Sequence, residues 1–469
     1  MASEGEATPD VESTETVPAG TDGSARHDGS PEGPDGYPFL GNVREFARDP
    51  LAFVTRVSRE YGPVSQYDLG VYEIYQLNDP ALVEHVLVHH NENYVKGDVF
   101  QTALRPIVGE GLLTSEGETW REQRHRIQPA FTPERINAAA GVMTDYAERL
   151  TDEWADGERR NVHDDMMQVT VEIVAQALFD VDIRERRGDL GGALEEVMDH
   201  AQRQMGRPVQ LPLWLPTPGN RRYKRALSTI DAVADDIVDR EADRERDAGR
   251  TDVVDMLMGD DSSTAAGVDR QRARDQIATL LLAGHETTAL SLTYALHALG
   301  RNPDVAATLH AELDAVCGDA PPTLADLPEL TYTEQVVKET MRLYPPVWEI
   351  LREPVADDVV GGDEIPAGAT VAMHQWVHHR DPDVWDDPLA FRPERWTDER
   401  ERSLPAYAYF PFGGGPRRCI GDRFAMLEAR LVLATIAREW TTSPVADLSF
   451  APSITLRPDG PVEMVVERR

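Results

Sequence analysis

The sequence predicts one large domain that is mainly α-helical and carries a small β region. Helical periodicity dominates from residue 119 to about residue 439, because apolar side chains return every three or four positions. A β-forming stretch runs from Arg352 to Met373, interrupted at Gly361-Gly362. We find no internal repeat and no interdomain linker, so a single domain is expected.

The first residues differ from the rest of the chain. Residues 1–35 consist largely of Glu, Asp, Ser, Thr, Gly and Pro, with almost nothing to bury, which is typical of a disordered acidic tail. The folded domain is therefore expected to span 36–469. Within it, Val64–Leu69 and Glu73–Leu77 have the composition of a hairpin, and a short helix is expected after Pro80.

The periodic region divides into separate helices. Pro345-Pro346 ends one of them, because proline disfavours the helical conformation of the residue before it. The expected helices are Trp120–Gln128, Glu134–Asp152, Met166–Phe179, Ala193–Met205, Arg222–Arg246, Arg270–Leu299, Val305–Cys317, Thr333–Tyr344 and Asp422–Glu439.

Composition limits the classes of partner. The 469 residues have 41% hydrophobic content and a formal net charge of -36. Nucleic acid is not expected as a partner, because its phosphates would repel this chain. Concentrated salt screens such self-repulsion, since the Debye length falls to about 3 Å at 1 M. The composition therefore resembles that of proteins from salt-loving archaea.

Targeting and membrane signals are not found in the sequence. No apolar run reaches the length of a membrane span, and the N-terminus lacks the layout of a signal peptide. We therefore expect a cytoplasmic protein without a transmembrane anchor.

One cysteine stands in surroundings that suggest chemistry. Cys419 lies in a glycine-rich loop behind Arg417-Arg418 and just before an apolar helix. Positive charge and a helix N-terminus should lower the pKa of its thiol, and a thiolate suits a soft metal. The glycines would let the backbone approach a bulky partner. Alone, the loop indicates either a metal ligand or a nucleophile. The second cysteine, Cys317, is expected to be a small buried hydrophobe.

The helix around residues 277–290 is apolar on nearly every side, yet it contains Gly284, Glu286 and Thr287. The glycine should make room against the helix face, and the acid and hydroxyl offer a proton source beside that room. The other interpretation is a solvated turn with Glu286 pointing outward. A zinc-protease helix would need a second histidine at position 289, where the chain has Ala289.

Two further pairs are weak signals when each is taken alone. Glu339 and Arg342 lie three residues apart and can pair on one helix face, with Arg395 following in a Phe-Arg-Pro-Glu-Arg-Trp run. Trp120 and Arg124 lie one helical turn apart. They could offer an N–H donor and a guanidinium to one anionic ligand.

Taken together, these motifs resemble the cytochrome P450 family, the haem-thiolate monooxygenases, over about residues 36–469. The cysteine loop matches at Phe412, Gly415, Arg417, Cys419 and Gly421. The run from Ala283 to Thr288 matches the family's oxygen-binding segment, and its Ala-Gly-His-Glu-Thr-Thr letters resemble soluble bacterial fatty-acid hydroxylases. The Glu-x-x-Arg pair, its partner arginine and the Trp-x-x-x-Arg helix also match, at the positions named above.

The resemblance implies the cytochrome P450 fold, a b-type haem and a role for each matching residue. Cys419 would be the axial thiolate, with Phe412 near the ring and backbone N–H groups near Gly421 moderating the charge on the sulfur. Ala283 and Gly284 would border the oxygen site, and Glu286 and Thr287 would deliver protons. Glu339, Arg342 and Arg395 would be structural. The haem carboxylates would be held by Trp120, Arg124, Arg352 and Arg417.

The activity implied is hydroxylation of a lipophilic small molecule with O2, using electrons from a separate ferredoxin-type donor. The apolar loop in residues 207–220 suggests fatty acids or isoprenoids as substrates and peripheral contact with lipid. A haem-thiolate isomerase or peroxygenase is the main alternative, although such enzymes usually alter the acid–threonine pair. A non-catalytic haem sensor or carrier is the third.

Overall fold

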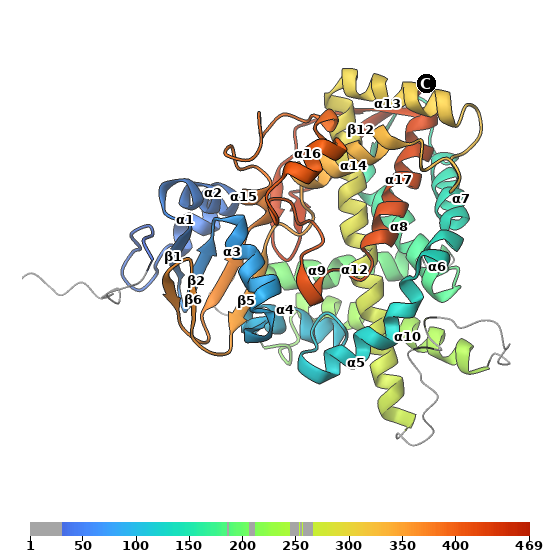
Figure 1. Cartoon of the computed structure of the whole chain (residues 1–469). Coiled ribbons are helices and arrows are strands. Elements are labelled where there is room, and N and C mark those ends of the chain that lie inside the picture. Colours follow the sequence, from blue (N-terminus) through green and yellow to red (C-terminus); the bar gives the residue numbers. More distant parts are fainter. Residues whose placement is uncertain (1–30, 185–186, 206–211, 244–252, 254–255, 257–265) are drawn as a thin grey trace, which may run out of the picture.

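The computed structural model describes residues 31–184, 187–205, 212–243, 253, 256 and 266–469. A helical body surrounds the long helix α12 (Ala266–Arg301), and a strand-rich part lies beside it (Figure 1). The expected tail falls mostly outside the described residues. Its last part packs on the domain, since the carbonyl of Glu32 accepts a hydrogen bond of 3.1 Å from the backbone N–H of Gln66.

Helices make up most of the described chain, in agreement with the predicted class. The α-helices are α1 (Val43–Arg48), α2 (Pro50–Glu60), α3 (Pro80–Glu84), α4 (Gly97–Val108), α5 (Gly117–Ile127), α6 (Pro133–Ala138), α7 (Ala140–Thr151), α8 (Val162–Phe179), α9 (Arg187–Met205), α10 (Pro218–Asp243), α12, α13 (Pro303–Val316), α14 (Thr331–Leu343), α15 (Gln375–His378), α16 (Asp398–Ser403) and α17 (Asp422–Glu439). Shorter segments are the π-helix η1 (His85–His89) and the 3-10 helices η2 (Asn91–Asn93), η3 (Gln128–Phe131), η5 (Pro393–Arg395) and η6 (Gly415–Arg417).

The strands form one larger sheet and three small ones. The larger sheet has the order β1-β2-β8-β5-β3, in which only β2 and β8 run parallel. The small sheets are β4-β12-β9, β6-β7 and β10-β11. The strands are β1 (Val64–Leu69), β2 (Tyr72–Leu77), β3 (Tyr94–Val95), β4 (Glu158–Asn161), β5 (Ile350–Pro354), β6 (Asp358–Val360), β7 (Asp363–Ile365), β8 (Thr370–Met373), β9 (Trp440–Pro444), β10 (Phe450–Pro452), β11 (Leu456–Pro458) and β12 (Glu463–Arg468).

Helix α12 is the centre of the core. It packs against α8, α10, α17 and α14, and nearly every residue from Gln276 to Leu299 is buried. A helix that is apolar on all sides can only lie inside a protein of this size, so the neighbouring helices are arranged around it. Helix α17 comes directly after the cysteine loop, and its packing on α12 fixes that loop beside the central helix.

Two expectations about elements are corrected. The segment Glu134–Asp152 is not one helix, because the backbone turns at Ala139 between α6 and α7. The local sequence does not explain the break, because alanine is the strongest helix former. The strands after α17, in residues 440–468, were not expected at all.

Candidate active site

The cysteine loop joins η6 to α17. The backbone N–H of Cys419 donates to the carbonyl of Phe412 over 3.0 Å, which closes the loop on itself. Gly415 has φ +60°, and a Cβ there would lie 1.8 Å from the carbonyl oxygen of Leu87 in η1. The sequence suggested that the glycines admit a bulky ligand. At this position the close neighbour is the protein's own π-helix.

Cys419 itself has an exposed side chain, although loss of hydration is the largest influence on its pKa. A thiol can be desolvated and exposed at once when it lies on the wall of an internal space. Burial raises the pKa of the thiol, while the N–H of Gly421 and the charge of Arg124 lower it by less. The expected lowering of the pKa is therefore wrong for the protein without a metal.

The two residues of the Trp-x-x-x-Arg pair lie on α5, next to this loop. Arg124 donates from Nη1 to the carbonyl of Arg418 over 2.9 Å. The Arg417 guanidinium lies 4.0 Å from the centre of the Trp120 ring. Arg417 also donates to the carbonyl of Ser115 over 2.9 Å. The predicted Trp120, Arg124 and Arg417 are thus brought together.

A surplus of positive charge accompanies them. Burial and the charges of Arg352 and Arg417 lower the pKa of Lys96, and Glu116 is the acid paired with Arg417. Loss of hydration and the Arg417 charge lower the pKa of Arg352 to about 10. The Arg352 guanidinium donates to the carbonyl of Leu351 over 2.8 Å.

Three clustered cations and one acid have a net positive charge, which a bound anion would balance. Two carboxylates of a bound group would satisfy it, because arginine binds carboxylates in a directed, often bidentate way. Lys96 was missed by the sequence analysis. It belongs to no motif, and only its rarity among 469 residues marked it, as one of three lysines.

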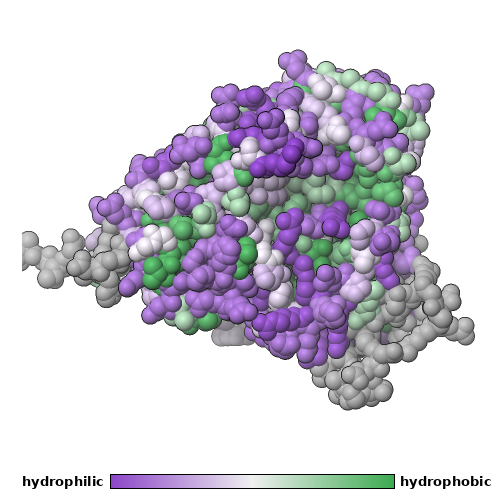
Figure 2. Space-filling view, in the orientation of Figure 1, coloured by the Kyte–Doolittle hydropathy of each residue, from purple (hydrophilic) through white to green (hydrophobic). Residues whose placement is uncertain are grey.

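The central helix presents one open face. Between Gln276 and Leu299 only Ala283, Gly284 and Thr287 are not fully buried. Positions i, i+1 and i+4 lie on the same side of a helix, so these three form a strip along internal space. Figure 2 shows the molecule hollowed near its centre, with neutral to hydrophobic walls.

Two members of the strip have clear constraints. The Thr287 hydroxyl donates to the carbonyl of Ala283 over 3.0 Å, which leaves its oxygen free to accept a hydrogen bond from a molecule in the space. A Cβ on Gly284 would lie 3.1 Å from a methyl group of Val174 in α8. The room that this glycine makes is therefore used partly for packing α8 against α12.

Glu286 is 2% exposed and lies off the open strip. Its carboxylate accepts from Arg457 Nε at 2.8 Å and from the Thr455 hydroxyl at 2.6 Å. Although burial raises the pKa of Glu286, Arg457 and the Thr455 hydrogen bond leave it below its usual value. The structure does not place this acid beside the hydroxyl of Thr287, which differs from the expected acid–hydroxyl pair.

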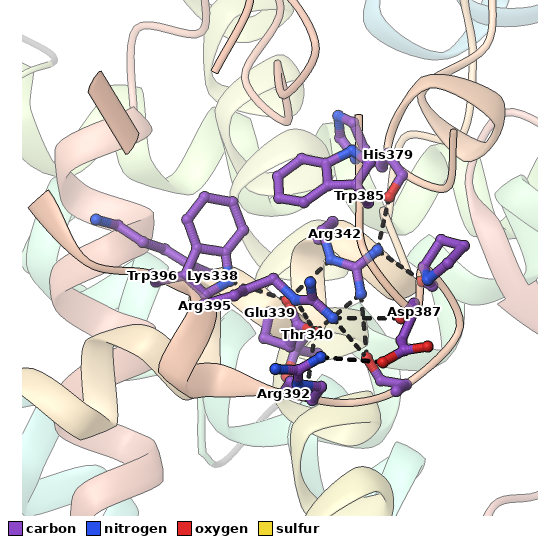
Figure 3. Close-up of polar contacts among 12 residues, drawn as sticks. Lys338, Glu339, Thr340, Arg342, His379, Trp385, Asp387, Arg392, Arg395 and Trp396 are labelled. Atoms are coloured by element: carbon purple, nitrogen blue, oxygen red, sulfur yellow. Dashed lines mark hydrogen bonds and ion pairs between the residues drawn. The ribbon is translucent and has the colours of Figure 1, made fainter. Parts of the chain in front are cut away.

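The Glu339 network is the most completely buried charged group of the site region (Figure 3). Arg342 pairs with both carboxylate oxygens of Glu339, at 2.8 and 2.9 Å. Arg395 reaches the same carboxylate at 3.0 Å. The indole N–H of Trp396 donates to it at 3.0 Å, a contact that the sequence did not suggest. Arg342 also donates to the carbonyl of His379 over 2.7 Å.

The network joins α14 to residues 379–396, which lead into the cysteine loop. It makes no contact with the open strip among the interactions described, so its geometry is that of a support. Of the predicted residues, the structure therefore gathers one group around Cys419, a second on α12 and a third around Glu339.

An exposed cysteine with surplus cations beside it is an arrangement that could hold a haem through a thiolate. Comparison with known proteins agrees. The model of the cytochrome P450 family matches residues 31–457. The chain belongs to the cytochrome P450 family.

Three similar proteins extend this result. Cyclooctatin synthase of Streptomyces melanosporofaciens is 37% identical over 93% of this chain and 95% of its own length. Cyclooctat-9-en-7-ol 5-monooxygenase of the same organism is 35% identical with the same coverage. The crystal structure of CYP175A1 from Thermus thermophillus superposes with a TM-score of 0.73 at 26% identity, covering 91% of this chain and 97% of that one.

Membership in the cytochrome P450 family implies the cofactor and the class of reaction. The cofactor is haem b, and the enzyme is a cytochrome P450 monooxygenase. Members of this family generally take electrons from a separate redox partner and bind a lipophilic substrate and O2. Among the described residues, no helix has both the length and the apolar character needed to cross a bilayer.

Proposed function

We propose that this enzyme hydroxylates an isoprenoid-like lipophilic substrate, with a ferredoxin-type protein as electron donor. The observation that carries the proposal is the open strip of Ala283, Gly284 and Thr287 on a helix that is otherwise buried. A buried helix leaves such a strip open only where a ligand will cover it.

The site residues support binding of haem in one orientation. Cys419 would ligate the iron, with the Gly421 N–H directed at its sulfur and Phe412 packed beside the ring. At the cation-rich edge the carboxylates would be held by Trp120, Arg124, Arg352, Arg417 and the additional Lys96. A bound haem would supply the oxygen chemistry, and the electron density donated to its iron by the Cys419 thiolate would favour O–O cleavage.

Proton delivery is the proposed task of Thr287, with Ala283 and Gly284 forming the wall beside it. The hydroxyl is held by Ala283 and keeps an acceptor lone pair toward the space. Thr455 and Arg457 both bond Oε1 of Glu286 and hold the carboxylate in place, so Glu286 could join this relay through its other oxygen or after leaving these partners. We therefore assign the proton-holding role at the site first to Thr287 and a water beside it.

Replacing Thr287 with alanine should lower the fraction of consumed electrons recovered as product several-fold, because a general acid–base group contributes about 10²–10⁴-fold to a proton-transfer step. Hydrogen peroxide should account for the electrons lost. The measurement is oxygen uptake against product formed. Thr293→Ala is the matched control, since Thr293 makes the same kind of hydroxyl-to-carbonyl bond, 2.7 Å to Ala289, at a fully buried place on the same helix.

Unchanged coupling in Thr287→Ala would contradict the relay, whereas product formed without oxygen uptake or a supply of electrons would favour the isomerase or peroxygenase alternative. A Glu286→Gln variant separates the two groups of the pair. If that substitution lowers coupling as much as the threonine change, Glu286 takes part in the relay together with Thr287.

The substrate class rests on a loop and on the relatives. Leu213 is 37% exposed and Trp214 is 76% exposed in the described part of the loop before α10. An apolar patch of this kind suits entry from lipid or contact with a lipid surface. The relative that names its substrate acts on cyclooctat-9-en-7-ol, by its name an unsaturated alcohol and not a fatty acid.

We therefore expect cyclic isoprenoid alcohols and hydrocarbons to shift the haem absorption from low to high spin at micromolar concentrations, by displacing water from the iron. Long-chain fatty acids should shift it at least about tenfold more weakly, a difference of about 1.4 kcal/mol in binding free energy. Titration of both libraries into one enzyme preparation measures this ratio. Tighter binding of fatty acids would restore the resemblance to fatty-acid hydroxylases.

The proposed function also includes the docking surface for the electron donor and the salt concentration at which the enzyme works. Arg121, Arg126 and Arg418 are exposed near the cysteine loop on a chain of net charge -36. Arg121 pairs with Glu118 at 3.2 Å and Arg418 with Asp422 at 2.8 Å, so part of this charge is already neutralised. We propose that an acidic ferredoxin docks here in a salt-rich cytoplasm, and assays belong in molar KCl, where the acidic excess is screened.

A further inference from the structure

The π-helix η1 brings two histidines together that an α-helix would separate. The N–H of His90 donates to the carbonyl of His85 over 2.8 Å, the i→i+5 bond of a π-turn. In an α-helix residues five apart differ by about 140° around the axis. Here the two imidazole rings stack, with centres 3.9 Å apart and planes 20° from parallel. Such π-turns are rare in proteins, and those that occur are often found at functional sites.

An acidic side chain from a different element completes the group. Asp358, the first residue of β6, places Oδ2 at 3.0 Å from His85 Nε2 and Oδ1 at 3.6 Å from His90 Nδ1. One ligand atom from each residue can be chosen so that all three lie within 4.8 Å of one another. Ligands about 2.1 Å from a metal lie roughly 3.0–3.5 Å apart in octahedral or tetrahedral geometry. Each imidazole already has a different oxygen of the Asp358 carboxylate at or near that distance, so a carboxylate that binds the ion through both oxygens would need only a small movement of the rings.

The carboxylate is held in place by neighbours that are not ligands. The Tyr94 hydroxyl donates to Asp358 Oδ2 over 2.8 Å, and the N–H of Val359 donates to Oδ1 over 2.9 Å. Together with His85 these bonds keep the pKa of Asp358 below its usual value in spite of burial. Asn93 ties the strand of Tyr94 to the chain before Asp358, donating to the carbonyl of Ala356 over 2.9 Å.

We propose that His85, His90 and Asp358 bind a divalent first-row transition metal ion of the zinc type. Two imidazole nitrogens and one carboxylate are ligands that zinc accepts, with a water in the open position. Magnesium and calcium prefer oxygen ligands and should bind poorly. Tyr94 takes the part of the outer-shell partner that orients a ligating carboxylate.

The site lies one layer from the cysteine loop. Segment η1 packs against η6, where the carbonyl of Leu87 comes so close to Gly415 that no Cβ would fit. A bound ion would join η1 to β6 and so fix the backbone against which the loop rests. The role follows from contacts outside the haem pocket, and it does not depend on the proposed substrate or donor.

The test uses untagged, haem-loaded enzyme that has been stripped with a chelator and dialysed against zinc ions in excess magnesium, which occupies sites made only of oxygen ligands. We expect one saturable zinc ion per chain. His90→Ala and Asp358→Asn should each raise the dissociation constant at least tenfold. Tyr94→Phe should raise it about tenfold, the lower range for an outer-shell partner.

His89→Ala is the matched control, because His89 is adjacent in the sequence, is exposed and makes its ion pair with Glu84 at 3.9 Å, outside the group. It should leave zinc affinity unchanged. The haem content of each variant shows that it is folded. If wild type takes up no saturable zinc, or if His90→Ala and Asp358→Asn bind it as tightly as wild type, the three residues form only a hydrogen-bonded cluster and the proposal is wrong.

Discussion

Replacing Glu339 with glutamine should prevent the accumulation of haem-loaded enzyme. Glu339 and Arg342 are both fully buried, and Arg395 is nearly so. The substitution leaves two guanidinium charges without their counter-ion in the interior. Breaking a buried pair by removing one partner costs about 3–5 kcal/mol, a large part of the roughly 5–15 kcal/mol that typically stabilises a folded protein. Thermal unfolding and the haem-to-protein ratio of the purified variant measure the loss.

Two matched variants separate burial of charge from loss of any one contact. Trp396→Phe removes one N–H donor but leaves both carboxylate oxygens bonded to Arg342, so we expect a loss of about 1–3 kcal/mol with haem retained. Arg392→Ala removes an exposed pair with Asp387 at 3.2 Å and should cost less than about 1 kcal/mol. A Glu339→Gln enzyme with normal haem content and stability would show that the network is not a support.

Much of the fold could be predicted because helix period and turn chemistry are local. Helix α17 has the predicted bounds, Asp422–Glu439, and strand β1 has the predicted Val64–Leu69. Helix α2 was missed although its start carries a strong local signal, Asp49 accepting from the N–H of Ala52 at 3.0 Å. Strands β10 and β11 have three residues each, too few to show an alternating pattern, although they pair with each other. Strand β12 pairs with β9 and with the distant β4, so its pairing cannot be read from the local sequence.

In the site, too, local sequence patterns predicted some features and missed those that depend on tertiary contacts. Residues recognised by motif spacing were brought together around Cys419 and Glu339. What spacing could not predict were partners from far along the chain. Arg457 stands 171 positions after Glu286, and its ion pair decides where that carboxylate points. Lys96 reaches the cation cluster from the segment between β3 and α4, which carries no motif. The spacing of motif residues can be read from the sequence, whereas the ion pairs that these residues make depend on tertiary contacts.

Replacing Cys419 with serine should abolish the red-shifted absorption of the reduced, carbon monoxide-bound enzyme, because that spectrum depends on thiolate ligation. Hydroxylation should fall more than about a hundredfold, equivalent to about 2.7 kcal/mol of activation free energy. A serine hydroxyl at this place gives the iron no soft anionic ligand. The matched control is Cys317→Ser, at the end of α13 outside the site, which should keep both spectrum and activity.

The raised pKa of the free thiol sharpens this prediction. Burial opposes ionisation of Cys419, and the Gly421 N–H, Arg124 and Arg418 offset only part of that cost. If Cys419 ligates haem iron as proposed, the iron would supply the remaining stabilisation of the thiolate, since a metal deprotonates a coordinating thiol outright. Cys317 is partly and not fully buried, and burial raises the pKa of its thiol, so thiol-specific alkylation in the haem-loaded enzyme should modify Cys317 slowly and Cys419 not at all, as peptide mapping would show. Equal modification of both cysteines at full haem content would contradict ligation by Cys419.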